Sequence, residues 1–184
     1  MPLKALRKYS ALERFRRAPL VSVRSPVVTL ATRRAEIRRI ARGLFDFDEL
    51  ARRALSRHWA GRTHEERAEF VGLFTDLLER SYMNRIEAYA GERIAYTSEV
   101  IDGTYATVRS KIITQRRSEV RINYRMHLHD GRWQVYDVLI DGVSFVSTYR
   151  SQFDRVIQAE SYGALVERLR KRNLDTAGVD RKKL

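Results

Sequence analysis

Few side chains in this sequence are of the kinds that catalyse reactions or bind metals. The chain has four histidines and no cysteine, which excludes thiolate metal ligands, thiol nucleophiles and disulfides. His127 and His129 share a strand face that we expect to contact water, whereas His58 and His64 lie far from them in the sequence. Because two imidazoles without a nearby carboxylate make a weak metal site, we expect no catalytic residue, no metal and no cofactor.

Asp137 and Tyr124 are the one pair of polar residues that could form an acid-base site. If Asp130-Gly131 is a two-residue turn between two strands, Asp137 lies opposite Tyr124 on the inward face of a sheet. Burial there would raise the pKa of Asp137 toward the range of a general base, although a shift of one residue in register would place it outside. A structural hydrogen bond is the other role that we consider for this carboxyl group.

The formal net charge of +13 is concentrated near the start of the chain. Residues 1–42 carry 12 Lys and Arg against two Glu, whereas residues 43–184 carry 24 basic and 21 acidic residues. Such a basic arm fits a tether to a membrane surface or to nucleic acid, or a solvated leader. A nucleic-acid module would need aromatic side chains on an exposed sheet face. Tyr124 is predicted on the buried face, so we expect no nucleic-acid partner.

Apolar residues at helical spacing, together with capping residues, predict five helices. Asp46 with Glu49 and Thr63 with Glu66 form capping-box patterns, and Ser161 is a third N-cap residue. The predicted helices span about 32–42, 46–61, 63–89, 146–157 and 161–169.

In the segment between the third and fourth helices, the apolar residues alternate instead, which predicts strands. Turn dipeptides at Asp102-Gly103 and Asp130-Gly131 connect antiparallel neighbours. The predicted strands span about 93–101, 104–114, 119–128 and 132–140, and Asp141-Gly142 closes the sheet. The predicted fold class is therefore α+β, with a curved four-stranded antiparallel sheet wrapped by about five helices around an apolar pocket.

The change in charge and periodicity along the chain suggests three parts. Residues 1–42 form a basic N-terminal arm, partly disordered and then helical, residues 43–172 form the folded domain, and residues 173–184 form a frayed tail. No apolar run approaches the roughly 18 residues that are needed to cross a bilayer.

Motifs at four places in the domain resemble, in order and spacing, those of a known family. They read F-D-F-D-E-L-A-R-R-A-L-S-R-H-W at Phe45–Trp59, A-E-F-V-G-L-F-T-D-L-L-E-R-S-Y at Ala68–Tyr82, W-Q-V-Y-D-V at Trp133–Val138, and G-V-S at Gly142–Ser144 followed by Y-R-S-Q-F at Tyr149–Phe153. The family is the MlaC and toluene-tolerance family of periplasmic phospholipid-binding proteins, which includes a variant associated with hopanoid synthesis.

This resemblance implies an NTF2-like sheet, a deep apolar pocket for the acyl chains of a phospholipid, and no enzymatic activity. It implies a periplasmic carrier between an outer-membrane lipoprotein complex and an inner-membrane ABC transporter complex with an MCE-domain subunit, with roles in outer-membrane lipid asymmetry and solvent tolerance. NTF2-like folds also include isomerases and dehydratases, so an enzyme that uses Asp137 with Tyr124 is the alternative. Family members begin with a secretory signal, whereas residues 1–42 lack the apolar core of about 7–15 residues that such a signal contains.

Helical stripes and strand alternation select the residues that we expect to line the lipid pocket. They are Leu50, Phe74, Leu78, Tyr82, Val146, Tyr149 and Phe153 on helices, and Val108, Ile112, Tyr124, Met126 and Val135 on strands. Ordinary core packing is the alternative role for each of them. Arg109, Lys111 and Arg150 are candidates to bind the phosphate of the headgroup, with a solvated surface as their alternative.

Overall fold

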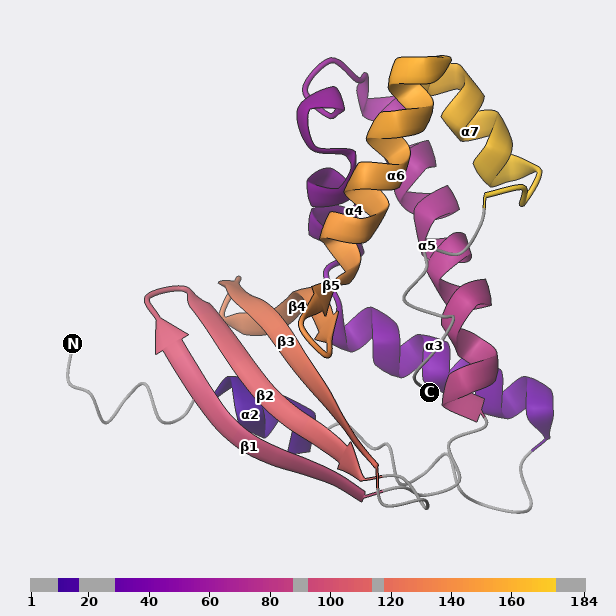
Figure 1. The fold of residues 1–184 in the computed structure, drawn as a ribbon. Helices are drawn as coiled ribbons and strands as arrows, with labels where there is room; N and C mark the ends of the chain where they lie inside the picture. The colour runs from indigo at the N-terminus through magenta and orange to yellow at the C-terminus, as the bar shows by residue number, and fades with distance from the viewer. Residues whose placement is uncertain (1–9, 17–28, 88–92, 114–117, 175–184) are drawn as a thin grey trace.

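The computed structural model describes residues 10–16, 29–87, 93–113 and 118–174. Helices and one antiparallel sheet confirm the α+β class (Figure 1). The helices are α2 (Ala11–Arg16), α3 (Leu30–Leu44), α4 (Phe47–Leu55), the short 3-10 helix η3 (Ser56–His58), α5 (His64–Glu87), α6 (Phe145–Ala159) and α7 (Tyr162–Arg170). The strands are β1 (Arg93–Asp102), β2 (Tyr105–Ile113), β3 (Glu119–His129), β4 (Arg132–Ile140) and β5 (Val143–Ser144). None of the described helices is long and apolar enough to cross a bilayer.

The predicted capping residues do start three helices. At α4, Asp46 Oδ1 accepts a hydrogen bond of 2.9 Å from the backbone N–H of Glu49. Before α5, the N–H of Thr63 donates to Glu66 Oε2 at 2.9 Å and the N–H of Glu66 donates to Thr63 Oγ1 at 3.2 Å. At α7, Ser161 Oγ accepts from a backbone N–H at 3.0 Å. These bonds satisfy donors that the first helical turn leaves without partners, so the helix starts are encoded locally.

The strands follow one another in the order β1-β2-β3-β4-β5, and residues with positive φ form two of the turns between them. Asp130 and Gly131 have φ of 47° and 72° and connect β3 to β4. Asp141 and Gly142 have φ of 47° and 89° and connect β4 to β5. Both pairs suit tight hairpins, which need left-handed residues at the turn. The predicted count of four strands misses β5, because two residues are too few to show alternation.

A β-bulge in β4 changes the register that the sequence predicts. Arg125 pairs with Asp137, and the register shifts beside this pair so that Tyr136 is the extra residue. The prediction that Asp137 lies opposite Tyr124 on the inward face is therefore wrong. One additional residue in a strand reverses the face that all following side chains occupy.

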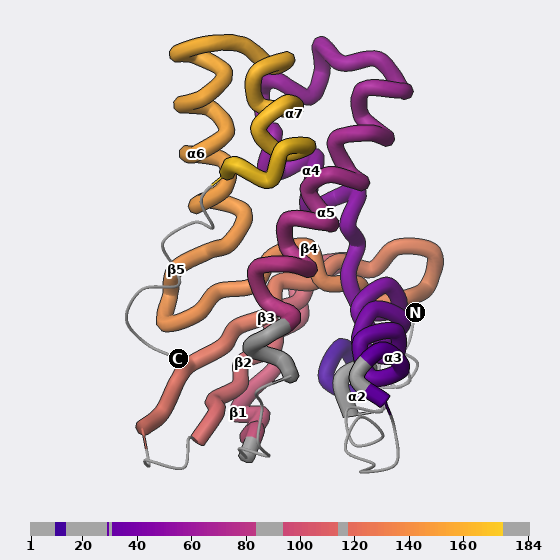
Figure 2. Tube along the Cα trace, turned by 90° about the vertical axis from the view of Figure 1, so that its right-hand side faces the viewer, coloured from indigo at the N-terminus to yellow at the C-terminus, as the bar shows by residue number. Residues whose placement is uncertain are grey.

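The apolar residues form two clusters. The helix cluster joins α4, α5, α6 and α7, which stand together beyond the end of the sheet in Figure 1. The sheet cluster covers the face of the sheet that carries Val108, Met126 and Val135, here called the inner face, and includes Ala11 of α2. Figure 2 shows α2 and α3 on one side of the sheet. The opposite, outer face carries Arg109 and Arg125, because successive residues of a strand point to opposite faces.

Candidate functional site

The inner face of the sheet is the most continuous apolar surface that the strands provide. Val108, Met126 and Val135 come from three neighbouring strands and are fully buried, and Tyr124 packs beside them. Their burial depends on cover from outside the sheet, since Ala11 of α2 belongs to the same cluster and is itself fully buried. Four of the predicted lining residues therefore lie together on this face.

A second group of predicted lining residues lies in the helix cluster. Phe74, Tyr149 and Phe153 make edge-to-face contacts there, with ring centroids 5.1 Å apart for Phe74 and Tyr149 and 5.3 Å apart for Phe74 and Phe153. Leu50 and Val146 are buried in the same cluster, and Leu78 packs against it with part of its surface exposed. Such geometry is that of a close-packed core, so these six residues support one another across α4, α5 and α6.

Tyr82 and Ile112 lie outside both groups of buried residues. Tyr82 of α5 stacks on Phe145, the first residue of α6, with ring centroids 4.7 Å apart. Phe145 in turn packs against the sheet cluster, so Tyr82 connects α5 to the inner face. Ile112 is half-buried in β2 and pairs with Val120 of β3. The structure thus divides the predicted set between two clusters and a connecting contact.

Several apolar residues of the inner face are absent from the predicted set. Trp133 and Val138 are buried in the sheet cluster, and Phe45, Ile140 and Phe145 pack against it. Trp133 follows the same alternation as Val135 and could have been found from it. Val138 and Ile140 lie beyond the bulge, and simple alternation from Val135 assigns them to the wrong face.

Asp137 is surrounded by hydrogen-bond donors of the fold, and only 2% of its surface is exposed. Ser144 Oγ donates to Oδ2 at 2.7 Å, the N–H of Val146 donates to Oδ1 at 3.1 Å, and Arg125 Nη1 donates to Oδ2 at 3.2 Å. Ser144 Oγ also caps α6 by accepting from the N–H of Ser147. The carboxylate therefore joins the bulge in β4 to the start of α6. Its geometry fits the structural hydrogen bond that we considered as its alternative role.

His127 has a carboxylate partner that the sequence analysis did not predict. Its Nε2 lies 2.9 Å from Oδ2 of Asp46, the N-cap of α4, and its ring stacks on that of His129. The expectation of a wet imidazole without a carboxylate is therefore wrong for His127, because α4 covers this part of the outer face. Among the described residues, no three His, Cys, Asp or Glu side chains are grouped so that they could hold a metal.

Two cavities lie apart from the predicted lining residues. The first has a volume of about 470 Å³ at the junction of α3 and α4, and is lined by Arg42, Phe45, Asp46, Phe47, Asp48, His129 and Gln134. The second has a volume of about 280 Å³ between α3 and α5, and is lined by Arg34, Arg38, Asp76, Glu79, Arg80, Met83 and Arg172. Charged side chains of both signs line each cavity, so neither has the chemistry of an acyl-chain site.

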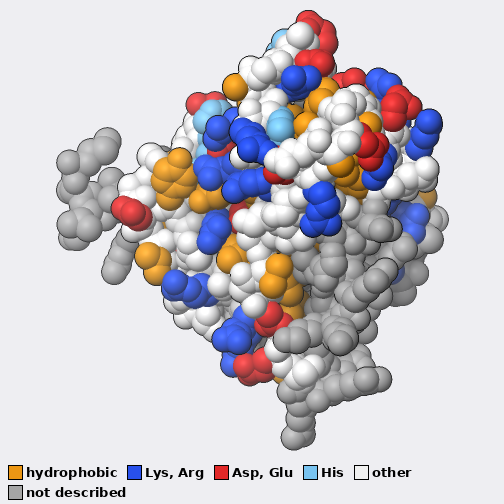
Figure 3. Space-filling view, turned by 45° about the horizontal axis from the view of Figure 1, so that its top comes forward, with side chains coloured by type: hydrophobic (Ala, Val, Ile, Leu, Met, Phe, Trp, Pro, Cys, Tyr) orange, Lys and Arg blue, Asp and Glu red, His pale blue; other side chains and the backbone are white. Residues whose placement is uncertain are grey.

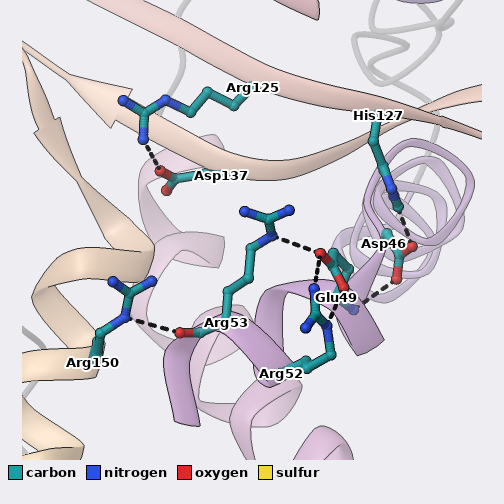
Figure 4. Close-up of polar contacts among 8 residues, drawn as sticks. All are labelled: Asp46, Glu49, Arg52, Arg53, Arg125, His127, Asp137 and Arg150. Carbon is teal, nitrogen blue, oxygen red and sulfur yellow. Dashed lines mark hydrogen bonds and ion pairs between the residues drawn. The ribbon is translucent and has the colours of Figure 1, made fainter. Parts of the chain in front are cut away.

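The three cations predicted to bind a headgroup are not brought together. Arg109 and Lys111 lie on the outer face of β2, where Lys111 Nζ is 2.7 Å from Glu119. Arg150 lies on α6, and its Nε donates to the carbonyl oxygen of Arg53 at 3.0 Å (Figure 4). Because Arg109 and Lys111 point away from the inner face, they do not adjoin the apolar surface.

Glu49 is held beneath two arginines of its own helix. Arg52 Nε donates to its Oε2 at 2.6 Å and Arg53 Nε donates to its Oε1 at 2.7 Å (Figure 4). Burial acts to raise the pKa of Glu49, but the hydrogen bonds from Arg52 and Arg53 outweigh burial and leave the pKa below its ordinary value. The guanidinium carbon of Arg53 also lies 4.0 Å from the centroid of the Tyr136 ring, and burial raises the pKa of Tyr136.

Comparisons with known proteins agree with this architecture. A family model described as MlaC protein matches residues 22–171. The structure is also similar to that of a phospholipid-binding protein from Ralstonia solanacearum in complex with a phospholipid, with a TM-score of 0.79 and 26% sequence identity. That match covers 89% of this chain and 97% of the other chain. Since the family model spans most of the sequence, the chain belongs to the MlaC family.

Proposed function

We propose that this protein is a phospholipid carrier that holds acyl chains against the inner face of its sheet. The observation that carries the proposal is this apolar face, on which Val108, Met126 and Val135 have no exposed surface. Membership of the MlaC family and the phospholipid bound by the Ralstonia solanacearum relative support it. Such a protein is a binding and transport protein, and its apolar face needs no catalytic group.

The physical need for a carrier follows from the cost of exposing acyl chains to water. Each methylene contributes about 0.8 kcal/mol, so a lipid with roughly 30 methylenes faces a barrier on the order of 20 kcal/mol to free transfer. A protein removes this barrier if its apolar surface replaces the membrane around the chains. The headgroup then stays at the opening, in contact with water.

Helix α2 is the cover of the inner face that costs least to displace. Its contacts with the sheet include the buried side chain of Ala11, the packing of Leu12 against the sheet cluster, and two hydrogen bonds to Glu99 of β1, from Ser10 Oγ and from the N–H of Leu12, both 2.9 Å long. The helix cluster, in contrast, is closed by interlocked aromatic rings. Segments with few buried apolar contacts open most easily, so lipid enters where α2 lies and the helix cluster supports the pocket from one end.

The family context extends the proposal to a transport route. The carrier works in the periplasm and shuttles phospholipid between an outer-membrane lipoprotein complex and an inner-membrane ABC transporter complex with an MCE-domain subunit, which maintains outer-membrane lipid asymmetry and solvent tolerance. Residues 43–172 supply most of the lipid-binding domain, to which Ala11 of α2, Ile37 of α3 and Leu174 add buried side chains from the flanking segments.

Native mass spectrometry of the full chain purified from a bacterial host, followed by lipid extraction, tests the proposal. Tyr124→Glu places a charge on the inner face, and Asn123→Glu places the same charge on the outer face of the same strand. We expect the wild type and Asn123→Glu to carry phospholipid and Tyr124→Glu to lose it, while circular dichroism shows that all three are folded. The proposal is contradicted if the two variants carry the same amount of phospholipid. It is also contradicted if the wild type neither carries lipid nor takes it from vesicles.

A further inference from the structure

Four arginines from three elements lie together on the outer side of the molecule. Arg52 and Arg53 come from α4, Arg125 from β3 and Arg150 from α6 (Figure 4). They are linked at close range, since Arg150 Nε donates to the carbonyl oxygen of Arg53 and Arg53 lies over the ring of Tyr136. In the space-filling view, Lys and Arg side chains gather on this side of the molecule with hydrophobic side chains beside them (Figure 3).

The carboxylates that pair with these arginines lie below them, so the surface presents the positive groups to solvent. The side chain of Arg52 is 52% exposed above Glu49, which is 15% exposed. The side chain of Arg125 is 46% exposed above Asp137, which is 3% exposed. Arg150 donates to a neutral carbonyl oxygen instead of a carboxylate. The four arginines thus pair with only two carboxylates, and the positive charge is exposed mainly at Arg52 and Arg125, whereas the side chain of Arg53 is 28% exposed.

The tip of the β1–β2 hairpin continues this surface with exposed apolar groups. Val100, Ile101 and Tyr105 are 50%, 43% and 49% exposed, which is unusual for large hydrophobic side chains in a compact domain. Tyr105 contacts Tyr136 edge to face, with ring centroids 6.0 Å apart. Since Tyr136 is also the ring below Arg53, Tyr105 connects the hairpin tip to the arginines.

We propose that this surface, made of Arg52, Arg53, Arg125, Arg150, Tyr105, Tyr136 and the tip residues Val100 and Ile101, docks the protein onto a bilayer of anionic phospholipid. Guanidinium groups bind phosphate by charge and by paired hydrogen bonds. Aromatic rings favour the headgroup level of a bilayer, and aliphatic side chains insert below it. On this surface the arginines are followed by the tyrosines and then by the aliphatic side chains, which is the order in which such groups contact the phosphates, the headgroup level and the acyl region of a bilayer.

The position of the tip favours a membrane over an acidic protein as the partner. Ile101 pairs with Ala106, which is buried in the sheet cluster, so the exposed tip leads directly onto the inner face. Docking through the tip brings the edge of the sheet that carries Ile101 to the membrane surface, and the inner face begins at this edge. This step rests on the proposed function.

Co-sedimentation of the full chain with vesicles tests the docking surface. The vesicles contain either phosphatidylcholine alone or phosphatidylcholine and phosphatidylglycerol in equal parts. We expect binding to the anionic vesicles only, and about fivefold weaker binding for each of the substitutions Arg52→Gln and Arg125→Gln, because a cation near a charged membrane contributes about that factor. The pair Val100→Ser with Tyr105→Ser should weaken binding by a similar or larger factor.

Arg121→Gln is the matched control for the arginine variants. Arg121 lies on the same outer face of β3, its side chain is 80% exposed, and it is separated from Arg125 along the strand. We expect it to change vesicle binding less than twofold. Equal loss of binding in Arg121→Gln overturns the proposal, because the effect would then come from net charge rather than from this surface.

The other outcomes separate the docking surface from its alternatives. If the arginine variants lose vesicle binding and the Val100→Ser/Tyr105→Ser variant does not, the hairpin tip takes no part in docking and the proposed surface is overturned. If the wild type does not bind the anionic vesicles at all, the membrane assignment is overturned in favour of an acidic protein partner. Binding to both kinds of vesicle alike overturns it as well. Native mass spectrometry of each variant keeps the two proposals apart, since docking variants should still carry lipid, whereas loss of lipid in the wild type contradicts the proposed function alone.

Discussion

Asp137→Ala provides the sharpest test of how the sheet is attached to the helices. The substitution removes the acceptor of hydrogen bonds from Ser144, Val146 and Arg125. It leaves the N–H of Val146 buried without its carboxylate partner, and it frees the serine that caps α6. The expected result is a large loss of stability without loss of the fold.

The magnitude follows from the three hydrogen bonds. A hydrogen bond to a charged group contributes about 1.5–3 kcal/mol, and the partly exposed Arg125 contributes at the low end because solvent screens it. Since the bonds are not additive, we expect a loss of about 3–5 kcal/mol, which is the range for breaking a buried pair. A domain whose stability lies in the middle of the usual range of about 5–15 kcal/mol remains folded after such a loss, with a Tm lowered on the order of 10 °C.

Urea unfolding followed by circular dichroism measures this loss. Asp154→Ala is the control, because Asp154 also accepts from Arg57 and His58 at 2.7 Å but does so at the surface, and its removal should lower stability much less. Asp137→Asn keeps the shape of the side chain and should lie between the wild type and Asp137→Ala. If Asp137→Ala unfolds at the same urea concentration as the wild type, or if Asp154→Ala costs as much, the structural role of Asp137 is refuted.

Three further predictions concern single contacts. Glu49→Gln should lower stability at neutral pH. Because the folded-state pKa of Glu49 is lowered, its contribution is present above the unfolded pKa of about 4.3 and is lost as the pH falls through the folded pKa. The assignment is contradicted if the difference in urea midpoint between the wild type and Glu49→Gln persists in strong acid. Thr63→Ala should cost about 1 kcal/mol by removing half of the capping box at α5, and unfolding experiments should show that Thr63→Ser restores most of it. Gly131→Ala should cost about 1–2 kcal/mol because its φ is 72°, whereas Gly61→Ala, at a site with open space around the added Cβ, should be nearly neutral in the same measurement.

The helix starts and the turns could be predicted because each depends on side chains or backbone conformations within a few residues of one another. The capping pairs at α4 and α5 and the N-cap at α7 act within three residues. The turn at Asp130-Gly131 selects a two-residue hairpin through its backbone conformation. The end of α4 was harder to predict, because the left-handed φ of 52° at Ser56 breaks the helical pattern without a glycine or proline to mark it.

The candidate site could be predicted only in part. Alternation correctly placed Val108, Met126 and Val135 on one buried face, because every second side chain of a regular strand points to the same face. It failed for Asp137 because the bulge at Tyr136 depends on how β4 packs against its neighbours.

What the sequence by itself determined about this protein is its family, its α+β class, and the starts of most helices and strands. These follow from interactions between residues close in the chain and from motifs that can be recognised in the amino-acid sequence. Only the tertiary structure decided that the apolar residues divide into two clusters, that His127 bonds to Asp46, and that four arginines meet beside an exposed hairpin tip. Each of these results joins residues far apart in sequence, and their proximity depends on how sheet and helices pack, which no local pattern encodes.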